Sequence, residues 1–145
     1  RAQRMSAAGV LLDGAPRTLT TATATAVAST FAHGLFLLAW EGAPAGSTPT
    51  RDVDIGTVPI GPLPSSIVAH TIATVDGSTG TVPAYGRGPT GGEVVWIDGT
   101  VLRGARAGES GATYRPEVLS FESVAPSQVW VAGDGTNELA VWSDH

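Results

Sequence analysis

Cysteine and lysine are both absent from this 145-residue chain, and only 14% of its residues are charged. Without cysteine there are no disulfides, no thiolate nucleophile and no cysteine-ligated zinc. The eight basic residues are all arginine, and thirteen acidic residues give a formal net charge of −5. Since an average globular domain has roughly 25% charged residues, much of this surface has to be built from small polar and apolar groups.

A clustered basic face, which proteins need to follow a phosphate backbone, is also missing. The closest approach to one is formed by Arg87, Arg103 and Arg106. Acidic residues such as Glu93 and Asp98 share this stretch, so a solvated strand edge is favoured over an anion site. Nucleic-acid binding is not expected.

Long apolar runs are absent too. The most apolar segment, residues 35–40, is too short to cross a bilayer. It also lies too far from the N-terminus, with too few basic residues before it, to be a signal peptide. The chain is therefore not expected to insert into a membrane.

Turn-forming residues, in contrast, are abundant: 19 glycines and 10 prolines interrupt the chain every few residues. Such spacing leaves little room for long helices and favours short strands joined by turns. Strand-like segments recur about every ten residues, which is typical of an all-β fold. The sequence predicts an antiparallel β-sandwich or jelly roll of about 8–10 short strands.

The length fits a single domain with a core of its own. Residues 1–16 are weakly patterned and are expected to be an N-terminal arm or contact segment, whereas residues 17–145 form one β-sandwich domain. Within residues 18–28, threonine alternates with alanine from Thr21 to Ala26, which predicts a strand, with an alanine-rich helix as the alternative. Residues 31–40 and 67–75 are predicted to be one buried strand each.

Residues 93–103, EVVWIDGTVLR, read as two strands joined by a turn at Asp98-Gly99. One predicted face is purely aliphatic and suits a core. The other face combines tryptophan and arginine, which are enriched at interface hot spots. We therefore predict that this second face, and the similarly two-sided strand 67–75, belong to one sheet that lies against a neighbouring subunit of a homotrimer. The predicted interface residues are Val94, Trp96, Val101, Arg103 and His70.

No motif for catalysis, metal binding or a cofactor stands out. The three histidines, at positions 33, 70 and 145, have no partner at metal-ligand spacing, so structural roles are favoured. Asp52-Val-Asp54 and the segment Asp134 to Glu138 offer oxygen ligands for calcium, but solvated turns are the preferred interpretation. No catalytic residue, metal site or cofactor is predicted.

A glycosidase would need two carboxylates at a suitable separation, which sequence does not give. Six acidic residues are candidates without a supporting motif, and solvated turn and edge positions are preferred for them. They are Glu41, Asp52, Asp54, Glu93, Glu117 and Glu122. The chain is expected not to be an enzyme.

Each of the four tryptophans lies near the end of an apolar strand beside an acidic turn. Rings in such positions can stack on sugars or anchor a core or an interface. Trp40 and Trp96 are expected in a core or subunit interface. Trp130 and Trp142 are the candidates for contact with a cell-surface glycan.

Four segments together resemble the C-terminal knob of bacteriophage tail fibres and minor tail proteins, a jelly-roll sandwich of the C1q and tumour-necrosis-factor type. They are residues 35–40, the segment GTVPIGP at 56–62, residues 67–74, and the segment VVWIDGTVL at 94–102. The resemblance implies a homotrimer on the virion surface that contacts other virion proteins and takes part in host attachment, without a cofactor.

The expected function is therefore that of a non-enzymatic attachment or structural module of a bacteriophage virion. A capsid decoration protein remains an alternative within the same class. A carbohydrate-binding β-sandwich of a secreted bacterial protein is the alternative from a different class.

Overall fold

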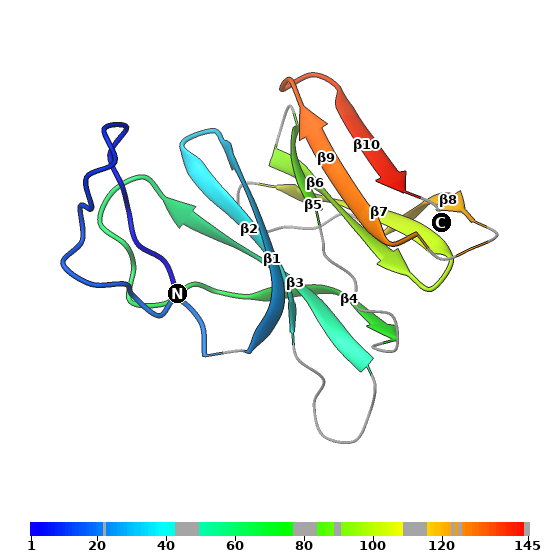
Figure 1. Cartoon of the computed structure of the whole chain (residues 1–145), viewed down its shortest axis with the longest axis horizontal. Helices are drawn as coiled ribbons and strands as arrows, with labels where there is room; N and C mark the ends of the chain where they lie inside the picture. The colour runs from blue at the N-terminus through cyan, green and yellow to red at the C-terminus, as the bar shows by residue number, and fades with distance from the viewer. Residues whose placement is uncertain are drawn as a thin grey trace.

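A computed structural model describes residues 1–21, 23–42, 50–76, 84–88, 91–108, 116–122, 124 and 126–143. In these residues every regular element is a β-strand, and all pairings between the ten strands are antiparallel (Figure 1). The predicted all-β class is confirmed.

The strands form two four-stranded sheets and one hairpin. The first sheet has the order β1-β2-β3-β4, with β1 at Ala24–Ala32, β2 at Leu35–Gly42, β3 at Thr50–Pro59 and β4 at His70–Asp76. The second sheet has the order β5-β6-β7-β8, with β5 at Ala84–Gly88, β6 at Gly91–Asp98, β7 at Val101–Gly108 and β8 at Glu117–Phe121. The hairpin consists of β9 at Gln128–Gly133 and β10 at Glu138–Ser143.

Within each sheet, every strand pairs with its neighbours in sequence. A jelly roll is instead built from Greek keys, in which a strand returns beside one that is distant in sequence. The two sheets are therefore consecutive meanders and do not have jelly-roll connectivity. The predicted β-sandwich is present.

The first hairpin turns at His33 and Gly34, where φ is 51° and 80°. Positive φ at both central residues is the requirement of a type I′ turn, which glycine meets without strain. Phe31 and Phe36 face each other across this hairpin, with ring centroids 5.1 Å apart. The prediction of one strand over residues 31–40 is wrong, because this turn divides it. The helix alternative for residues 18–28 also fails, since β1 begins at Ala24.

The β6–β7 hairpin turns one residue later than predicted. Asp98 pairs with Val101, so the central residues are Gly99 and Thr100 and not Asp98 and Gly99. Gly99 has a φ of 64°, which suits the first central position of a type II′ turn. Each residue of β6 therefore pairs with a β7 residue two positions later than predicted. Because side chains alternate along a strand, a shift of two residues leaves the predicted division into two faces unchanged.

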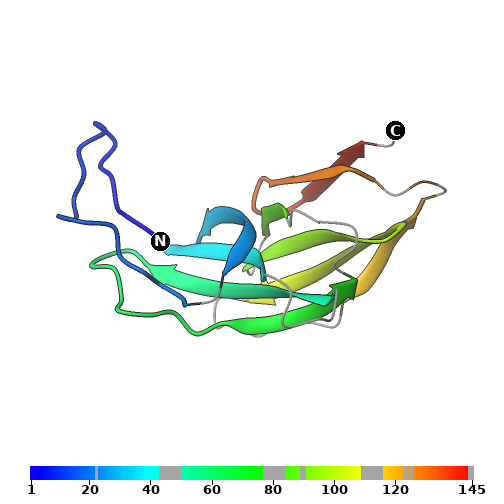
Figure 2. The same ribbon diagram turned by 60° about the horizontal axis from the view of Figure 1, so that its bottom comes forward.

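Both faces of β6 are covered by the same chain. Val94 and Trp96 lie in the main core between the two sheets, together with Leu37, Val53 and Ile55 of the first sheet. On the opposite face, the β9–β10 hairpin lies over the second sheet (Figure 2). A second core of buried residues fills the space between them. Its members are Ala84, Val95, Ile97, Leu102 and Val129.

The predicted subunit interface is therefore wrong for Val94 and Trp96, because each is 0% exposed in the single chain. Sequence showed that this face needed a cover but not that the first sheet supplies it. The prediction that residues 67–75 share a sheet with this hairpin is wrong as well, because β4 belongs to the first sheet.

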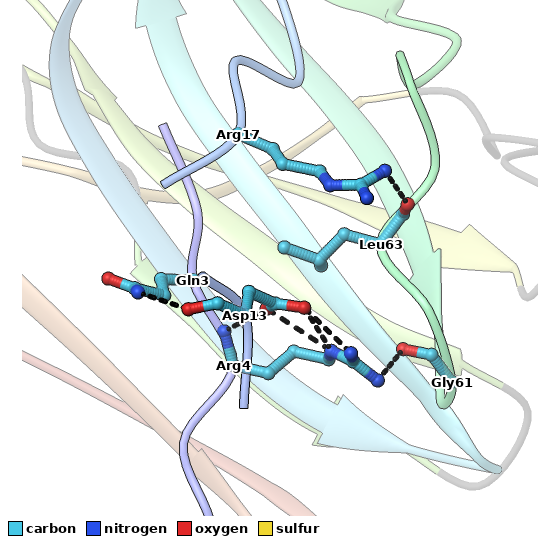
Figure 3. Close-up of polar contacts among 6 residues, drawn as sticks. All are labelled: Gln3, Arg4, Asp13, Arg17, Gly61 and Leu63. Carbon is cyan, nitrogen blue, oxygen red and sulfur yellow. Dashed lines mark hydrogen bonds and ion pairs between the residues drawn. The ribbon is translucent and has the colours of Figure 1, made fainter. Parts of the chain in front are cut away.

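The N-terminal segment is held by contacts to the segment that follows β3 (Figure 3). The Arg4 guanidinium lies 2.6 Å from a carboxylate oxygen of Asp13 and donates to the Gly61 carbonyl at 2.7 Å. Arg17 donates to the Leu63 carbonyl at 3.0 Å. Figures 1 and 2 show that residues 1–17 extend from the sandwich as a loop. Its exposed apolar side chains are Met5, Val10, Leu11 and Leu12.

Candidate functional site

A cleft of about 560 Å³ opens between the second sheet and the β9–β10 hairpin. Glycines allow the hairpin to lie close to the sheet: a methyl group on Gly86 would overlap Val131, and one on Gly133 would overlap the Arg87 backbone. The lining comes from all strands of this region except β5. It consists of Glu93, Val95, Gly104, Ala105, Arg106, Glu117, Leu119, Val131, Glu138, Ala140 and Trp142.

The floor of the cleft follows from strand alternation. Glu93 and Val95 are two residues apart on β6 and therefore point to the same face. Their cross-strand partners on β7 are Arg106 and Gly104. Because Gly104 has no side chain, the Glu93 carboxylate lies over it, and its other oxygen is 3.8 Å from the Arg106 guanidinium.

The opposite wall is one face of β10. Glu138, Ala140 and Trp142 alternate along the strand, so their side chains share a side. The turn before β10 is held by Asp134, whose carboxylate accepts the Thr136 amide at 2.7 Å and the Asn137 amide at 2.8 Å. Asp134 therefore supports the hairpin that carries the cleft wall, as the turn interpretation predicts.

Carboxylates in the cleft are insufficiently neutralised. Burial, with Glu138 and Glu117 nearby, raises the pKa of Glu93 to about 7, although Arg106 opposes the shift. Burial also raises the pKa of Glu138. The positive charge of Arg106 and a hydrogen bond from the Glu93 amide partly offset this rise. Tyr85 lies beneath the cleft. Burial, together with the negative charges of Glu138 and Glu93, raises its pKa far above the usual range. The site is half-buried, partly apolar and negatively charged.

The two tryptophans predicted to bind glycan lie on opposite faces of the same hairpin. Trp142 is half-buried and lines the cleft. Trp130 pairs with Val141 on the outer face and is 53% exposed, beside exposed Leu139. The structure thus joins only Trp142 to the cleft carboxylates.

The remaining predicted interface residues lie outside the cleft. Arg103 is half-buried and its guanidinium is 2.7 Å from the Asp98 carboxylate. Val101 is half-buried at the start of β7, and His70 is exposed at the start of β4 in the other sheet. These three residues do not form one surface with Val94 and Trp96, which are buried.

Most of the other candidate carboxylates have structural partners. Glu41 is buried at the inner face of the first sheet, 3.3 Å from Arg51. Asp54 accepts a hydrogen bond from Thr71 at 2.6 Å, and Asp52 accepts one from Thr74 at 2.7 Å. Glu122 accepts one from Ser120. Of the six candidates, the cleft contains Glu93 and Glu117.

Sequence reasoning missed Glu138 as part of this site and treated Arg106 as part of a basic stretch. The signal for Glu138 was its spacing of two and four residues from Ala140 and Trp142, which places all three on one strand face. Nothing local could show that this face meets Glu93, because β6 and β10 are not paired in either sheet.

Among the residues that the structure describes, no three histidine or acidic side chains are placed to hold a metal ion. The same residues contain no helix that could span a membrane. Comparison with protein-family models, curated proteins and solved structures finds no match. The function is therefore inferred from the cleft and from the chain's own residues.

Proposed function

We propose that this chain is a non-enzymatic attachment module that binds a saccharide in the cleft under the β9–β10 hairpin. The observation that supports the proposal best is that Trp142 and Glu93 line one cavity, which is large enough for a small ligand.

A sugar ring presents an apolar C–H face and a rim of hydroxyl groups. The indole of Trp142 offers a flat apolar surface on which the C–H face of the sugar can stack. The hydroxyl groups of the sugar can donate hydrogen bonds to the carboxylates of Glu93, Glu117 and Glu138. Hydrogen bonds to charged acceptors are stronger than those to neutral ones. Val95 and Val131 exclude water from one side of the cleft, which strengthens these polar contacts.

The resemblance of four short segments to tail-fibre knobs supports a place for this module on a bacteriophage virion, where binding a cell-surface saccharide would contribute to host attachment. Homotrimer formation belongs to this proposal. Since Trp96 is buried, exposed apolar side chains elsewhere would have to form the subunit contact. Candidates on the outer face of β1 and β2 are Val27, Phe31 and Phe36.

Two matched tryptophan variants test the saccharide site. We expect Trp142→Ala to weaken binding of a saccharide found by array screening at least tenfold, which is about 1.4 kcal/mol. Trp130→Ala removes the same side chain from the other face of the hairpin and should change affinity less than twofold. Equal losses in both variants, or a loss in Trp130→Ala alone, would show that the cleft is not the site.

Glycoside hydrolysis is the second candidate, favoured by one observation. A carboxyl group with a pKa of about 7 beside other carboxylates is the pairing that a general acid and its partner require. Product release from an array-identified oligosaccharide, abolished by Glu93→Gln, would establish it. Tight binding without product over a day would support the attachment module instead.

A further inference from the structure

The charge of the cleft limits which saccharide it can hold. Three glutamates line it, from β6, β8 and β10, and Arg106 is the one basic residue among the described residues of the lining. Arg106 is itself mostly exposed and lies 3.8 Å from Glu93, beyond hydrogen-bond distance. When its glutamates are ionised, the cleft therefore carries excess negative charge that no described lining residue compensates.

An anionic sugar would add to this charge and is disfavoured. A neutral sugar could donate hydroxyl hydrogen bonds but would leave the charges unbalanced in a partly desolvated site, where such imbalance is most unfavourable. A cationic group would correct this imbalance, because it would bring positive charge to the glutamates of the lining.

We propose that the cleft selects a saccharide bearing a protonated amino group, such as an oligomer of de-N-acetylated hexosamine, whose ammonium pairs with Glu93 and Glu138. This inference rests on the proposed saccharide-binding function. The glutamates supply two acceptors from facing strands, β6 and β10, so an ammonium with three donors can be shared between them.

Selectivity should then depend on pH. The charged groups around Glu93 are Glu138 from β10, Arg106 from β7 and Glu117 from β8. Tyr85 from β5 is also close to Glu93, but its side chain lies on the other face of the sheet. Since the pKa of Glu93 is about 7, this carboxylate takes up a proton between pH 7 and pH 5. The ligand's amine only gains charge over the same range. A loss of selectivity at pH 5 must therefore come from the carboxylates of the protein.

The test uses two ligands of equal length, an oligomer of glucosamine and one of N-acetylglucosamine, titrated calorimetrically into the full chain. At pH 7 we expect the amino oligomer to bind at least tenfold more tightly, and at pH 5 no more than threefold. Glu93→Gln and Glu138→Gln should each reduce the preference at pH 7 to less than threefold, because each variant weakens the amino oligomer much more than the N-acetylated one. Glu122→Gln, which removes a carboxylate outside the cleft, should leave the preference unchanged.

Removing the opposing positive charge should have the reverse effect. Arg106→Gln is expected to raise the preference for the amino oligomer about threefold at pH 7, whereas Arg103→Gln, outside the cleft, should not alter it. A preference that rises in Arg106→Gln but falls in Glu93→Gln and Glu138→Gln cannot come from general damage to the fold.

The outcomes separate this inference from the function on which it rests. Equal affinity for the two oligomers, lost in Trp142→Ala, would overturn the amino-sugar preference and keep the saccharide site. Binding of neither oligomer, nor of any other saccharide on an array, would overturn both. If a lysine-rich peptide binds more tightly than the amino oligomer and responds to the same variants, the cationic ligand is a protein and the saccharide assignment is wrong.

Discussion

Replacing Glu93 with glutamine should stabilise the chain at alkaline pH and have little effect at acidic pH. Folding raises the pKa of Glu93 from 4.5 to about 7, so the folded state binds more protons than the unfolded state between these values. Stability contributed by protonated Glu93 is therefore present below pH 4.5 and is lost as pH rises through 7. Glutamine stays neutral and avoids this loss.

The size of the effect follows from the shift. One pKa unit corresponds to about 1.4 kcal/mol, so the full shift sets an upper limit of about 3 kcal/mol. The side chain of Glu93 is 16% exposed and opens onto the cleft, so solvent screening lowers the expected gain to about 1–2 kcal/mol at pH 8. For a chain of this length, that corresponds to about 2–4 °C in Tm for each kcal/mol.

Urea denaturation of the wild type and the variant at pH 4 and pH 8 measures this difference directly, since shifts of other groups cancel between the two proteins. Glu122→Gln serves as the control, because Glu122 lies outside the cleft and is bonded to Ser120. A gain for Glu93→Gln that is the same at both pH values, or larger at pH 4, would refute the account of the cleft's electrostatics.

Three further predictions follow from packing. Trp96→Ala should lower the free energy of unfolding by about 3–5 kcal/mol, because the indole is fully buried between the sheets. Gly133→Ala should cost about 1–3 kcal/mol and weaken saccharide binding, because a methyl group there would overlap the Arg87 backbone and displace the β9–β10 hairpin. Asp13→Asn should speed proteolysis within residues 1–17 while Tm changes little, because Arg4 loses its ion pair and the sandwich core is untouched.

Each of these three predictions has an outcome that would contradict it. A fully folded Trp96→Ala that only fails to oligomerise would restore the subunit-interface interpretation. Gly14→Ala is the control for Gly133→Ala, since a methyl group at Gly14 meets nothing within 4 Å, and equal effects of the two would show that the hairpin is not closely docked. Unchanged proteolysis of Asp13→Asn would mean that Arg4 does not hold the arm.

Sequence predicted the strands well because their signal is local. Alternation and turn residues marked nearly every strand, and the two faces of residues 93–103 were separated correctly even though the turn was placed one residue early. That error has a physical cause: Asp-Gly favours a type I′ turn, whereas Gly99-Thr100 forms a turn that needs positive φ only at glycine.

The arrangement of the sheets could not be predicted, because it depends on contacts between distant segments. Val94 and Trp96 looked like an interface since nothing local showed that Leu37 and Ile55 would cover them. The cleft was missed for the same reason. Its glutamates come from three strands that are separated in sequence, and only the docking of the β9–β10 hairpin brings Glu138 to Glu93.

Amide chemical-shift mapping of the isotope-labelled chain, titrated with the tightest-binding saccharide, tests the cleft as the binding site most directly. The largest changes should fall on Glu93, Arg106, Val131 and Glu138, together with the indole N–H of Trp142, and should saturate with the calorimetric Kd. Changes centred on Trp130 and Leu139 of the outer hairpin face, or on the N-terminal arm, with the cleft amides unmoved, would contradict it.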